Sequence, residues 1–297
     1  MKLCVGAVSR IVVEEAAKLK VPQIVASRRQ VDIGGGYTGY DQAGLVDTVE
    51  RLSDGKTDVV RDHGGPYRNG KKDDDWIASF DADVDAGFDV LHIDVCDILK
   101  EDQQEVLRGL LERYARRVRV EVGGERDSQE WLDTLLDTAL EYTIPEYTVT
   151  CVGGYAHADR QAGYRKPIET VAEITQRYHD KGTHSKAHNM DLMGKRLDYA
   201  PVLDAYNVAP EFASVELDAW FRAMSFEDTW FILDRAYESK EWTRWFDPNE
   251  GTRYERARCA ARYIMNRPDI KFVFDGYMGT VVEEYVRSEV SDAVARG

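Results

Sequence analysis

The sequence predicts an α/β fold, a closed (β/α)8 barrel with additional C-terminal helices, on the strength of three observations. Short apolar runs rich in Val and Ile alternate with longer amphipathic stretches, which is the pattern of repeated βα units around a parallel sheet. Eight such runs can be counted, and eight strands are the number that closes this kind of barrel. A chain of 297 residues with 43% apolar content can bury one large core.

The expected strands cover 3–8, 23–26, 58–61, 90–94, 119–122, 148–152, 185–188 and 205–208. The expected helices between them cover 11–19, 43–52, 74–87, 102–116, 128–142, 167–181 and 193–205. From about 210 onward the alternation stops, and the chain becomes helical and aromatic, with Trp220, Trp230, Trp242 and Trp245. We expect 210–297 to be a helical extension packed on the barrel within a single domain, 1–297. One strand-like run, 270–274, has no assigned place.

Composition narrows the classes of protein to which the chain can belong. A formal net charge of -15 disfavours binding to nucleic acid and to anionic membrane surfaces. The four cysteines are widely separated and form no CxxC pair, so we expect reduced thiols. The N-terminus MKLCVGAVSR lacks the apolar core of a secretory signal, and no apolar stretch approaches a membrane span. We therefore expect a cytoplasmic protein.

Polar residues gather just after the predicted strands, where parallel barrels place their catalytic groups. Five of the six histidines, all except His179, lie at or beside strand ends. Imidazole nitrogens and a carboxylate are ligands that Zn²⁺ prefers, and a catalytic site keeps a position open for substrate. Any one histidine could be an ordinary core or loop residue, but three on matching strand ends favour one shared site. The predicted metal ligands are His63, Glu125, His157 and His188.

Two carboxylates near these histidines are candidates for catalysis together with Glu125. Adjacent residues at a strand end point to different sides, so Asp62 can act as acid or base while His63 binds the metal. Alternatively, Asp62 caps the following helix or pairs with an arginine. His92 and Asp94 share one strand face by the period of two. They either face the barrel mouth or form a buried hydrogen-bonded pair that only holds the strand.

Two runs after the second predicted strand suggest anion binding: Ser27-Arg28-Arg29-Gln30 and the glycine-rich stretch 34–40. Arginine side chains match phosphate or carboxylate, and glycine backbone can approach a ligand closely, although a triple glycine is more often a flexible turn. Lys186, one pleat before His188, is a second cation that could face the mouth. We therefore expect a small anionic ligand. The candidate substrate-binding residues are Arg28, Gln30, Gly35, Gly36, Arg61, His92, Lys186, Asp191 and Asn207.

The order of these motifs resembles that of a known family. The motifs are the run 30–40 with its GGYTG core, Asp62-His63-x-Gly-Pro66, His92-Ile-Asp94, Gly123-Gly-Glu125, Ala187-His188-x-x-Asp191 and Asn207-Val-Ala-Pro210. They resemble the tagatose-bisphosphate aldolase GatZ/KbaZ-like family, (β/α)8 proteins related to class II aldolases, over most of the chain. The chain is shorter than the usual members, and Tyr155-Ala-His157 stands where the family has an acidic residue nearby.

The resemblance implies a metal-dependent site for ketose phosphates or related sugar acids. Family members are described as aldolase accessory subunits or as sugar epimerases. By position, the Asp-His pair of class II aldolases, acid/base and metal ligand, matches Asp62 and His63. Their later glutamate matches Glu125, and their last two histidine ligands match His157 and His188.

From the residues and the resemblance together we expect a metal-dependent epimerase of a ketose phosphate or related keto-sugar. It would act through a metal-stabilised enolate, by retro-aldol and aldol steps or by deprotonation and reprotonation. The alternatives are a class II aldolase component and a non-catalytic partner subunit of such an aldolase. The expected cofactor is a divalent metal ion, Zn²⁺ first, with Mn²⁺, Co²⁺ and Ni²⁺ as alternatives. The expected partners are a small anionic sugar and a second copy or an aldolase subunit, without nucleic acid or membrane.

Overall fold

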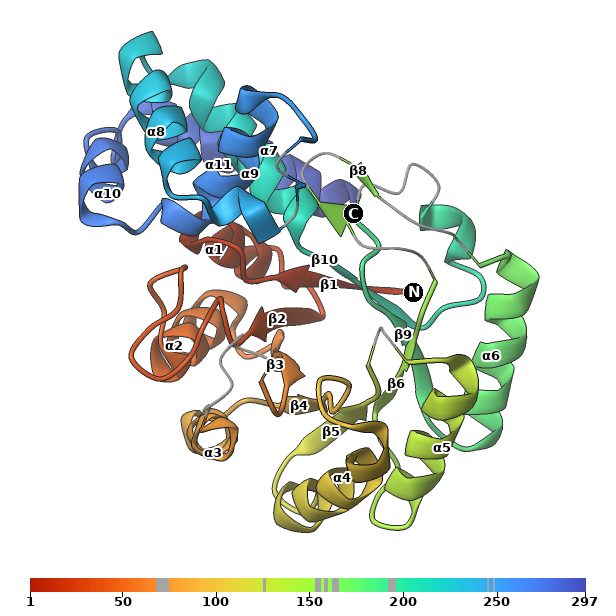
Figure 1. Cartoon of the computed structure of the whole chain (residues 1–297). Helices are drawn as coiled ribbons and strands as arrows, with labels where there is room; N and C mark the ends of the chain where they lie inside the picture. The colour runs from red at the N-terminus through yellow and green to blue at the C-terminus, as the bar shows by residue number, and fades with distance from the viewer. Residues whose placement is uncertain are drawn as a thin grey trace.

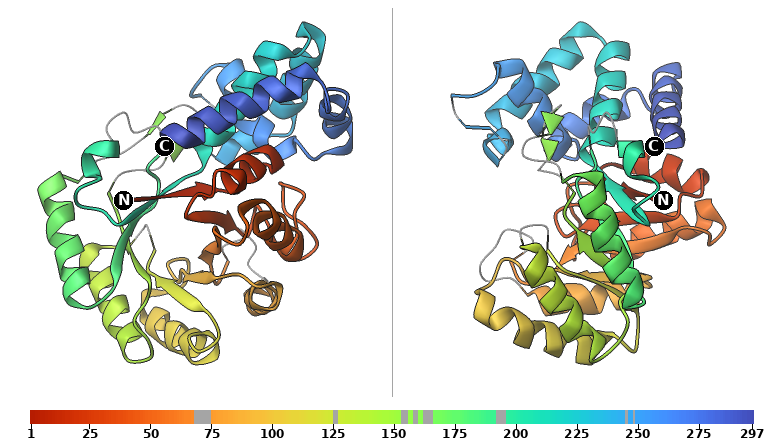
Figure 2. Two further views of the ribbon diagram at one scale, coloured as in Figure 1. Left: turned by 180° about the vertical axis from the view of Figure 1, so that it is seen from behind. Right: turned by 90° about the vertical axis from the view of Figure 1, so that its right-hand side faces the viewer.

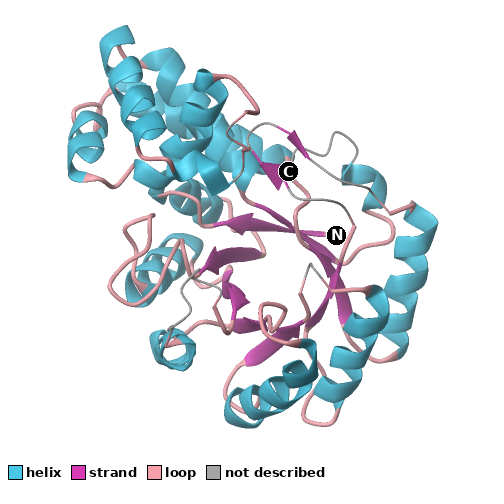
Figure 3. Ribbon diagram, viewed as in Figure 1, coloured by secondary structure: helices cyan, strands magenta, loops and turns pink. Residues whose placement is uncertain are grey.

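The protein is described by a computed structural model over residues 1–67, 75–124, 127–152, 156–157, 160–161, 166–191, 196–244, 246–247 and 249–297. In these residues eight parallel strands close into a barrel, in the order β1-β10-β9-β6-β5-β4-β3-β2, and helices cover its outside (Figures 1 and 3). The prediction of a (β/α)8 barrel with additional C-terminal helices is confirmed.

The barrel strands lie close to the predicted ranges. They are β1 (Lys2–Gly6), β2 (Gln23–Ser27), β3 (Asp58–Gly64), β4 (Val90–Ile93), β5 (Arg119–Val122), β6 (Tyr147–Thr150), β9 (His184–Ala187) and β10 (Ala205–Val208). The helices between them are α1 (Arg10–Lys18), α2 (Gln42–Ser53), α3 (Trp76–Ala86), α4 (Lys100–Tyr114), α5 (Gln129–Leu140) and α6 (Ile168–Asp180). Two short strands, β7 (Ala156–His157) and β8 (Arg160–Gln161), pair antiparallel outside the barrel sheet.

Several barrel helices begin at a side-chain cap that satisfies a backbone N–H left over at the helix start. Ser9 accepts a hydrogen bond from the Val12 N–H at α1, and Asp41 accepts one from the Gly44 N–H at α2. Ser128 caps α5 in the same way. Such caps stabilise a helix by about 1 kcal/mol and determine where it begins. At α1, the cap leaves only Ala7 and Val8 between the strand and Ser9, so this loop stays close to the barrel mouth.

The inside of the barrel changes from apolar to polar along the strands. Cys4, Val25, Val60, Val90, Tyr147 and Ala205 form one buried apolar cluster. Side chains alternate faces along a strand, so the residues two positions later point to the same side. On β3, β4 and β10 those later residues are Asp62, His92 and Asn207. The polar layer therefore lies one pleat nearer the C-terminal ends of the strands.

The chain after β10 is helical in its described part. It contains α7 (Pro210–Ala223), α8 (Phe226–Glu238), the 3₁₀ turn η2 (Glu241–Arg244), α9 (Arg253–Ile264), α10 (Pro268–Asp275) and α11 (Val281–Arg296). Helix α11 lies beside α1 and α7, which Figure 2 shows from behind. Arg287 of α11 forms ion pairs with Glu14 and Glu15 of α1, both at 2.8 Å. The extension thus packs on the first βα unit, while the single-domain assignment stays a prediction.

Two predictions of secondary structure are wrong. The strand-like run 270–274 lies in α10, because Pro268 suits a helix start and the buried Ile270 and Phe274 are spaced four residues apart on one helix face. In place of a helix over 193–205, the structure describes the 3₁₀ turn η1 (Arg196–Tyr199), and 192–195 lie outside the described residues.

No disulfide joins the four cysteines. Among the described helices, none has the length and apolar character needed to cross a membrane.

Candidate metal centre

Four side chains from distant parts of the chain meet at the C-terminal ends of the barrel strands. Asp62 and His63 come from β3, His92 comes from β4, and His188 directly follows β9. One potential ligand atom from each lies within 4.8 Å of the others. His92 and His188 are buried, whereas Asp62 and His63 are partly exposed. This group, called the mouth cluster below, brings together two predicted metal ligands, a predicted catalytic residue and a predicted substrate-binding residue.

An irregularity in β3 places consecutive residues in the same cluster. The register between β3 and β4 shifts between Arg61 and Gly64, and His63 adopts a positive φ of 49°. A non-glycine residue in this region costs about 1–3 kcal/mol, so the surrounding contacts must hold it there. We expected Asp62 and His63 to point to different sides, and this was wrong because the bulge breaks the strand alternation.

Two carboxylates outside the cluster orient its imidazoles. His63 Nδ1 lies 2.7 Å from Asp94 Oδ2, and His188 Nε2 lies 2.7 Å from Glu121 Oε1. Because carboxylates only accept hydrogen bonds, each of these ring nitrogens is the protonated donor. The opposite nitrogens, His63 Nε2 and His188 Nδ1, then carry lone pairs, and they lie 3.3 Å apart. A carboxylate that orients a metal-binding histidine in this way is a common feature of metal sites.

The Asp62 carboxylate completes a set of three electron-pair donors. Its Oδ1 lies 3.5 Å from His188 Nδ1 and 3.7 Å from His63 Nε2. Around a tetrahedral Zn²⁺ with bonds of about 2.0–2.1 Å, ligand atoms are separated by about 3.3 Å. Three acceptors that face one another at such distances repel unless a cation or proton lies between them. Within the described residues, Asp62, His63 and His188 therefore form the set best able to hold a divalent cation.

His92 supports the cluster from behind. Its Nδ1 accepts a hydrogen bond from the His63 backbone N–H at 3.1 Å, and its Nε2 donates to the Gly123 carbonyl at 2.6 Å. Both ring nitrogens are engaged with backbone, and the side chain is fully buried. His92 thus holds the ends of β3 and β5 through backbone groups rather than by pairing with Asp94, and substrate binding by His92 stays a prediction. Asp94, a predicted catalytic residue, is also fully buried and is hydrogen-bonded to His63.

Glu121 is a site residue that the sequence analysis missed. It lies within β5 with no exposed surface, and it accepts hydrogen bonds from His188 and from Lys186 Nζ, which lies at 2.8 Å. Burial raises the pKa of Glu121, but Lys186, His92 and His188 together lower it more, so this pKa lies well below its ordinary value. The available signal was a carboxylate within the predicted strand 119–122, one residue before its end.

Lys186 and Arg61, two predicted substrate-binding residues, form ion pairs inside the protein. Lys186 is 1% exposed and binds Glu121 and Gln23 inside the barrel, so its charge is neutralised by the protein. Arg61 is fully buried and pairs with Asp83 of α3, and it also donates to two backbone carbonyls. It points outward because the inward face of β3 carries Asp62. Both cations are buried and paired within the protein, and substrate binding by either stays a prediction.

The glycine-rich loop after β2 is held by its own hydrogen bonds. Arg28 pairs with Asp32 at 3.0 Å, and the Gln30 side chain accepts from the Ser27 N–H at 2.7 Å. A Cβ on Gly36 would lie 2.0 Å from the Gln30 carbonyl oxygen, so this close approach requires glycine. Gly35, with φ of 95°, has open space around it. The loop begins beside the cluster, since Ser27 is the register partner of Asp62.

The last two substrate-binding candidates, Asp191 and Asn207, lie near the end of β10. Asp191 Oδ1 accepts from the backbone N–H groups of Ala209 and Glu211, both at 2.8 Å, and thereby caps α7. Burial raises the pKa of Asp191 to about 7. Asn207 Nδ2 lies 3.3 Å from Asp62 Oδ1, while its own Oδ1 is buried and accepts no hydrogen bond from the described residues. Asn207 thus offers an unused acceptor beside the cluster.

Two predicted residues cannot be placed. Glu125, predicted as a ligand and a catalytic residue, lies outside the described residues. The backbone of His157 belongs to β7, but its side chain is outside the described part of the chain.

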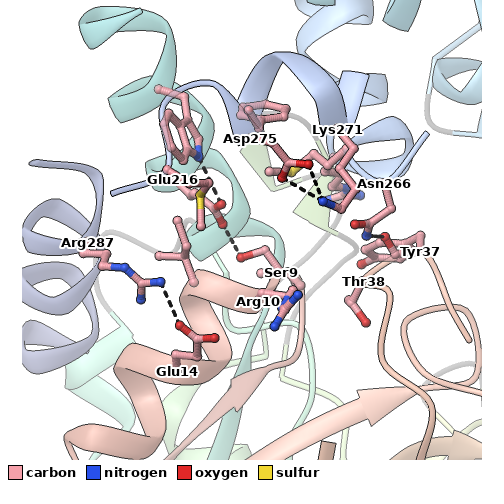
Figure 4. Close-up of a pocket in the computed structure, with 17 residues that line it drawn as sticks. Ser9, Arg10, Glu14, Tyr37, Thr38, Glu216, Asn266, Lys271, Asp275 and Arg287 are labelled. Atoms are coloured by element: carbon pink, nitrogen blue, oxygen red, sulfur yellow. Dashed lines mark hydrogen bonds and ion pairs between the residues drawn. The ribbon is translucent and has the colours of Figure 1, made fainter. Parts of the chain in front are cut away.

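A cavity of about 180 Å³ lies where the barrel meets the C-terminal helices (Figure 4). Its lining includes Ser9 at the start of α1, Tyr37 in the β2–α2 loop, and Glu216 and Trp220 of α7. The Glu216 carboxyl accepts hydrogen bonds from the Ser9 hydroxyl and, at 3.2 Å, from Trp220 Nε1. Burial raises the pKa of Glu216 to about 7. We refer to this space as the junction cavity.

No protein-family model matches the sequence, and no curated protein matches it significantly. Solved structures do share the fold, a closed (β/α)8 barrel. A probable tagatose 6 phosphate kinase from Sinorhizobium meliloti 1021 aligns with a TM-score of 0.74 at 17% identity, covering 99% of this chain and 98% of that one.

Two aldolases align over similar lengths with lower scores. The YdjI aldolase from Escherichia coli K12 has a TM-score of 0.55 at 9% identity and covers 93% of this chain and 89% of its own. A fructose-bisphosphate aldolase from Campylobacter jejuni has a TM-score of 0.55 at 13% identity, with coverage of 91% and 89%. At these identities the likeness shows the fold alone.

Proposed function

We propose that this protein is a metal-dependent, aldolase-type enzyme that breaks or forms a carbon–carbon bond in a ketose phosphate or related sugar. The observation behind the proposal is the convergence of His63 Nε2, His188 Nδ1 and Asp62 Oδ1, three electron-pair donors 3.3–3.7 Å apart. The cluster lies at the C-terminal end of the barrel strands, where enzymes of this architecture carry their active sites. The named functions of two structural neighbours, both aldolases, support the same class of reaction.

His63, His188 and Asp62 would hold the ion, which we propose to be Zn²⁺, with Mn²⁺, Co²⁺ and Ni²⁺ as alternatives. When bound, such a cation supplies Lewis-acid polarisation of the ketose carbonyl and its neighbouring hydroxyl. Asp94 and Glu121 keep both imidazoles in the tautomer that presents a lone pair. The buried Oδ1 of Asn207 accepts a hydrogen bond from a substrate hydroxyl.

Asp62 is the proposed proton-handling residue. Its Oδ1 faces the imidazoles, and its Oδ2 makes no hydrogen bond or ion pair with the described residues. In the cleavage direction, Oδ2 accepts the proton of the carbon-four hydroxyl while the bond between carbons three and four breaks. Carbon four leaves as an aldehyde, the electron pair remains on the ketone fragment, and Asp62 returns the proton to carbon three.

The epimerase that the family resemblance suggests would use the same groups. If the aldehyde is retained, turned over and rejoined, the product is inverted at carbon four instead of cleaved. We therefore treat epimerisation, and membership of the GatZ/KbaZ-like family, as a narrower form of the proposal. A small anionic sugar as ligand, and a second copy or an aldolase subunit as protein partner, belong to the same proposal.

The test is to purify the full chain alone, measure its bound metal, and incubate it with a panel of ketose phosphates and uronates. Triose or aldehyde products support the aldolase, and an inverted sugar as the sole product moves the assignment to the epimerase. Activity should disappear with a chelator and return with Zn²⁺, and His63→Ala should abolish it. Turnover that persists without metal, or full activity of His63→Ala, would contradict the mechanism.

A further inference from the structure

A second group of two histidines and one aspartate lies at the opposite end of the barrel. His179 is in the last turn of α6, His184 is the first residue of β9, and Asp204 directly precedes β10. Because β9 and β10 are parallel neighbours, their N-terminal ends lie at the same edge of the sheet. His184 therefore lies at the N-terminal end of β9, whereas the mouth cluster lies at the C-terminal ends of the strands. We had grouped His184 with the histidines at the strand ends.

The ligand atoms of these three side chains are close enough to share one ion. His179 Nε2 donates a hydrogen bond to Asp204 Oδ2 at 2.8 Å, and an ion that binds here would replace the proton of this nitrogen. His184 Nδ1 lies 3.8 Å from the same oxygen. All three ligand atoms fall within 4.8 Å of one another. These separations bracket the spacing of about 3.3 Å between ligands of a tetrahedral site. Small rotations of the two exposed rings suffice to reach it.

The carboxylate of this group is held in place by the protein. Asp204 Oδ2 accepts hydrogen bonds from the backbone N–H and the hydroxyl of Ser185, at 2.8 and 3.0 Å. The same hydroxyl accepts from Thr175 at 2.9 Å, so the orientation is supported from behind. Asp204 Oδ1 makes no hydrogen bond with the described residues and remains available as a ligand. Supporting hydrogen bonds of this kind raise the affinity of a metal site.

Exposure leaves room for solvent to complete a coordination shell. The His179, His184 and Asp204 side chains are 40%, 58% and 28% exposed. Three protein ligands and one water make a four-coordinate site. Two imidazoles and one carboxylate suit borderline divalent ions, whereas Mg²⁺ and Ca²⁺ prefer all-oxygen shells.

We propose that His179, His184 and Asp204 form a second cation site, the N-terminal-end site, which takes Zn²⁺ and related ions such as Ni²⁺ and Cu²⁺ but not Mg²⁺. An ion there joins the C-terminal end of α6 to the starts of β9 and β10. The site is independent of the mouth cluster, because it shares no residue with it and lies at the other end of the strands. Its role is to brace this end of the barrel.

The experiment counts Zn²⁺ bound per chain by elemental analysis, after dialysis of the full-length protein against micromolar Zn²⁺ with excess Mg²⁺. We expect two ions for the native chain, one for His184→Ala, one for His63→Ala and none for the double variant. Asp180→Asn, which removes a neighbouring exposed charge on α6 without touching a ligand, is the matched control and should keep two ions.

The outcomes separate this proposal from the proposed function. A His184→Ala protein that binds as much Zn²⁺ as the native chain contradicts the N-terminal-end site and does not affect the proposal for the mouth cluster. A His63→Ala protein that loses no ion overturns the mouth cluster alone. As a second readout, saturating Zn²⁺ should raise the melting temperature of His63→Ala, and this rise should be absent when His184 is also replaced. An equal rise in His63→Ala and in the double variant counts against the N-terminal-end site.

Discussion

Asp62 in the mouth cluster and Glu216 in the junction cavity are both carboxyls in protein interior, yet their ionisation is opposite. Burial raises the pKa of each, but the surrounding imidazoles of His63, His92 and His188 lower the pKa of Asp62 below its ordinary range overall. Glu216 is surrounded mainly by neutral donors, Ser9 and Trp220, and its pKa rises to about 7. Because burial acts on both carboxyls in the same direction, the difference between them comes from their neighbours.

This contrast explains why the mouth cluster, and not the cavity, suits a cation. In the cluster, an ionised carboxylate and two lone pairs face one point, and two further carboxylates fix the tautomers of the imidazoles. In the junction cavity, the carboxyl has a pKa of about 7, so it still holds a proton at a pH where Asp62 is ionised, and it joins the barrel to α7. One arrangement is suited to holding positive charge, and the other to packing two parts of the fold together.

The largest expected effect comes from changing each carboxyl to its amide. We expect Asp62→Asn to lower kcat of the proposed reaction by about 10²–10⁴-fold, because the amide cannot take up the proton. Glu216→Gln is the matched control and should keep kcat within a few-fold of the native value. Steady-state kinetics of both variants, with metal content measured in parallel, checks the prediction. Near-native turnover by Asp62→Asn would remove this residue from the mechanism.

The next effect is on stability and sharpens the difference in ionisation. The folded pKa of Glu216 is about 7 against an ordinary value of 4.5, so the folded state holds the proton more tightly. Its contribution is fully present below about pH 4.5 and is lost as the pH rises to about 7, with a maximum of about 3 kcal/mol. The free energy of unfolding of the native chain, minus that of Glu216→Gln, should fall over this range in denaturant titrations.

Asp62 should behave in the opposite way in the same titrations. Its folded pKa is lowered, so its contribution is present above the ordinary pKa near 3.8 and is lost as the pH falls below it. A difference curve for Asp62→Asn that slopes like that of Glu216→Gln would show that the two carboxyls are not distinguished by their neighbours.

The smallest expected effect concerns the carboxylates that orient the imidazoles. We expect Asp94→Asn and Glu121→Gln each to weaken binding of Zn²⁺ at the mouth cluster by about 10–100-fold, or about 1.4–2.7 kcal/mol. The amide oxygen can still accept a hydrogen bond from the imidazole N–H, but this hydrogen bond is weaker than one to a carboxylate. Competition with a chromophoric chelator measures the change, and Asp102→Asn on the exposed face of α4 is the control. Unchanged affinity in both variants would reduce these carboxylates to a packing role.

Much of the architecture could be predicted because its causes are local in sequence. Eight apolar runs separated by amphipathic stretches specify strands and helices, and the period of two along β9 correctly puts Lys186 and His188 on one face. The same pattern put Asp62 and His63 at the end of a strand. Local periodicity also misled once, since 270–274 is rich in β-forming residues but begins after a proline and belongs to a helix.

The closed barrel decided what local pattern could not. Lys186 binds Glu121 and Arg61 binds Asp83 because strand closure and helix packing bring these charges together, and the partners lie 65 and 22 residues apart. The bulge that turns Asp62 and His63 to one side depends on the register of β3 against β4. Strand alternation is a property of each segment alone, whereas charge pairing and register depend on which segments become neighbours, and that requires the folded chain.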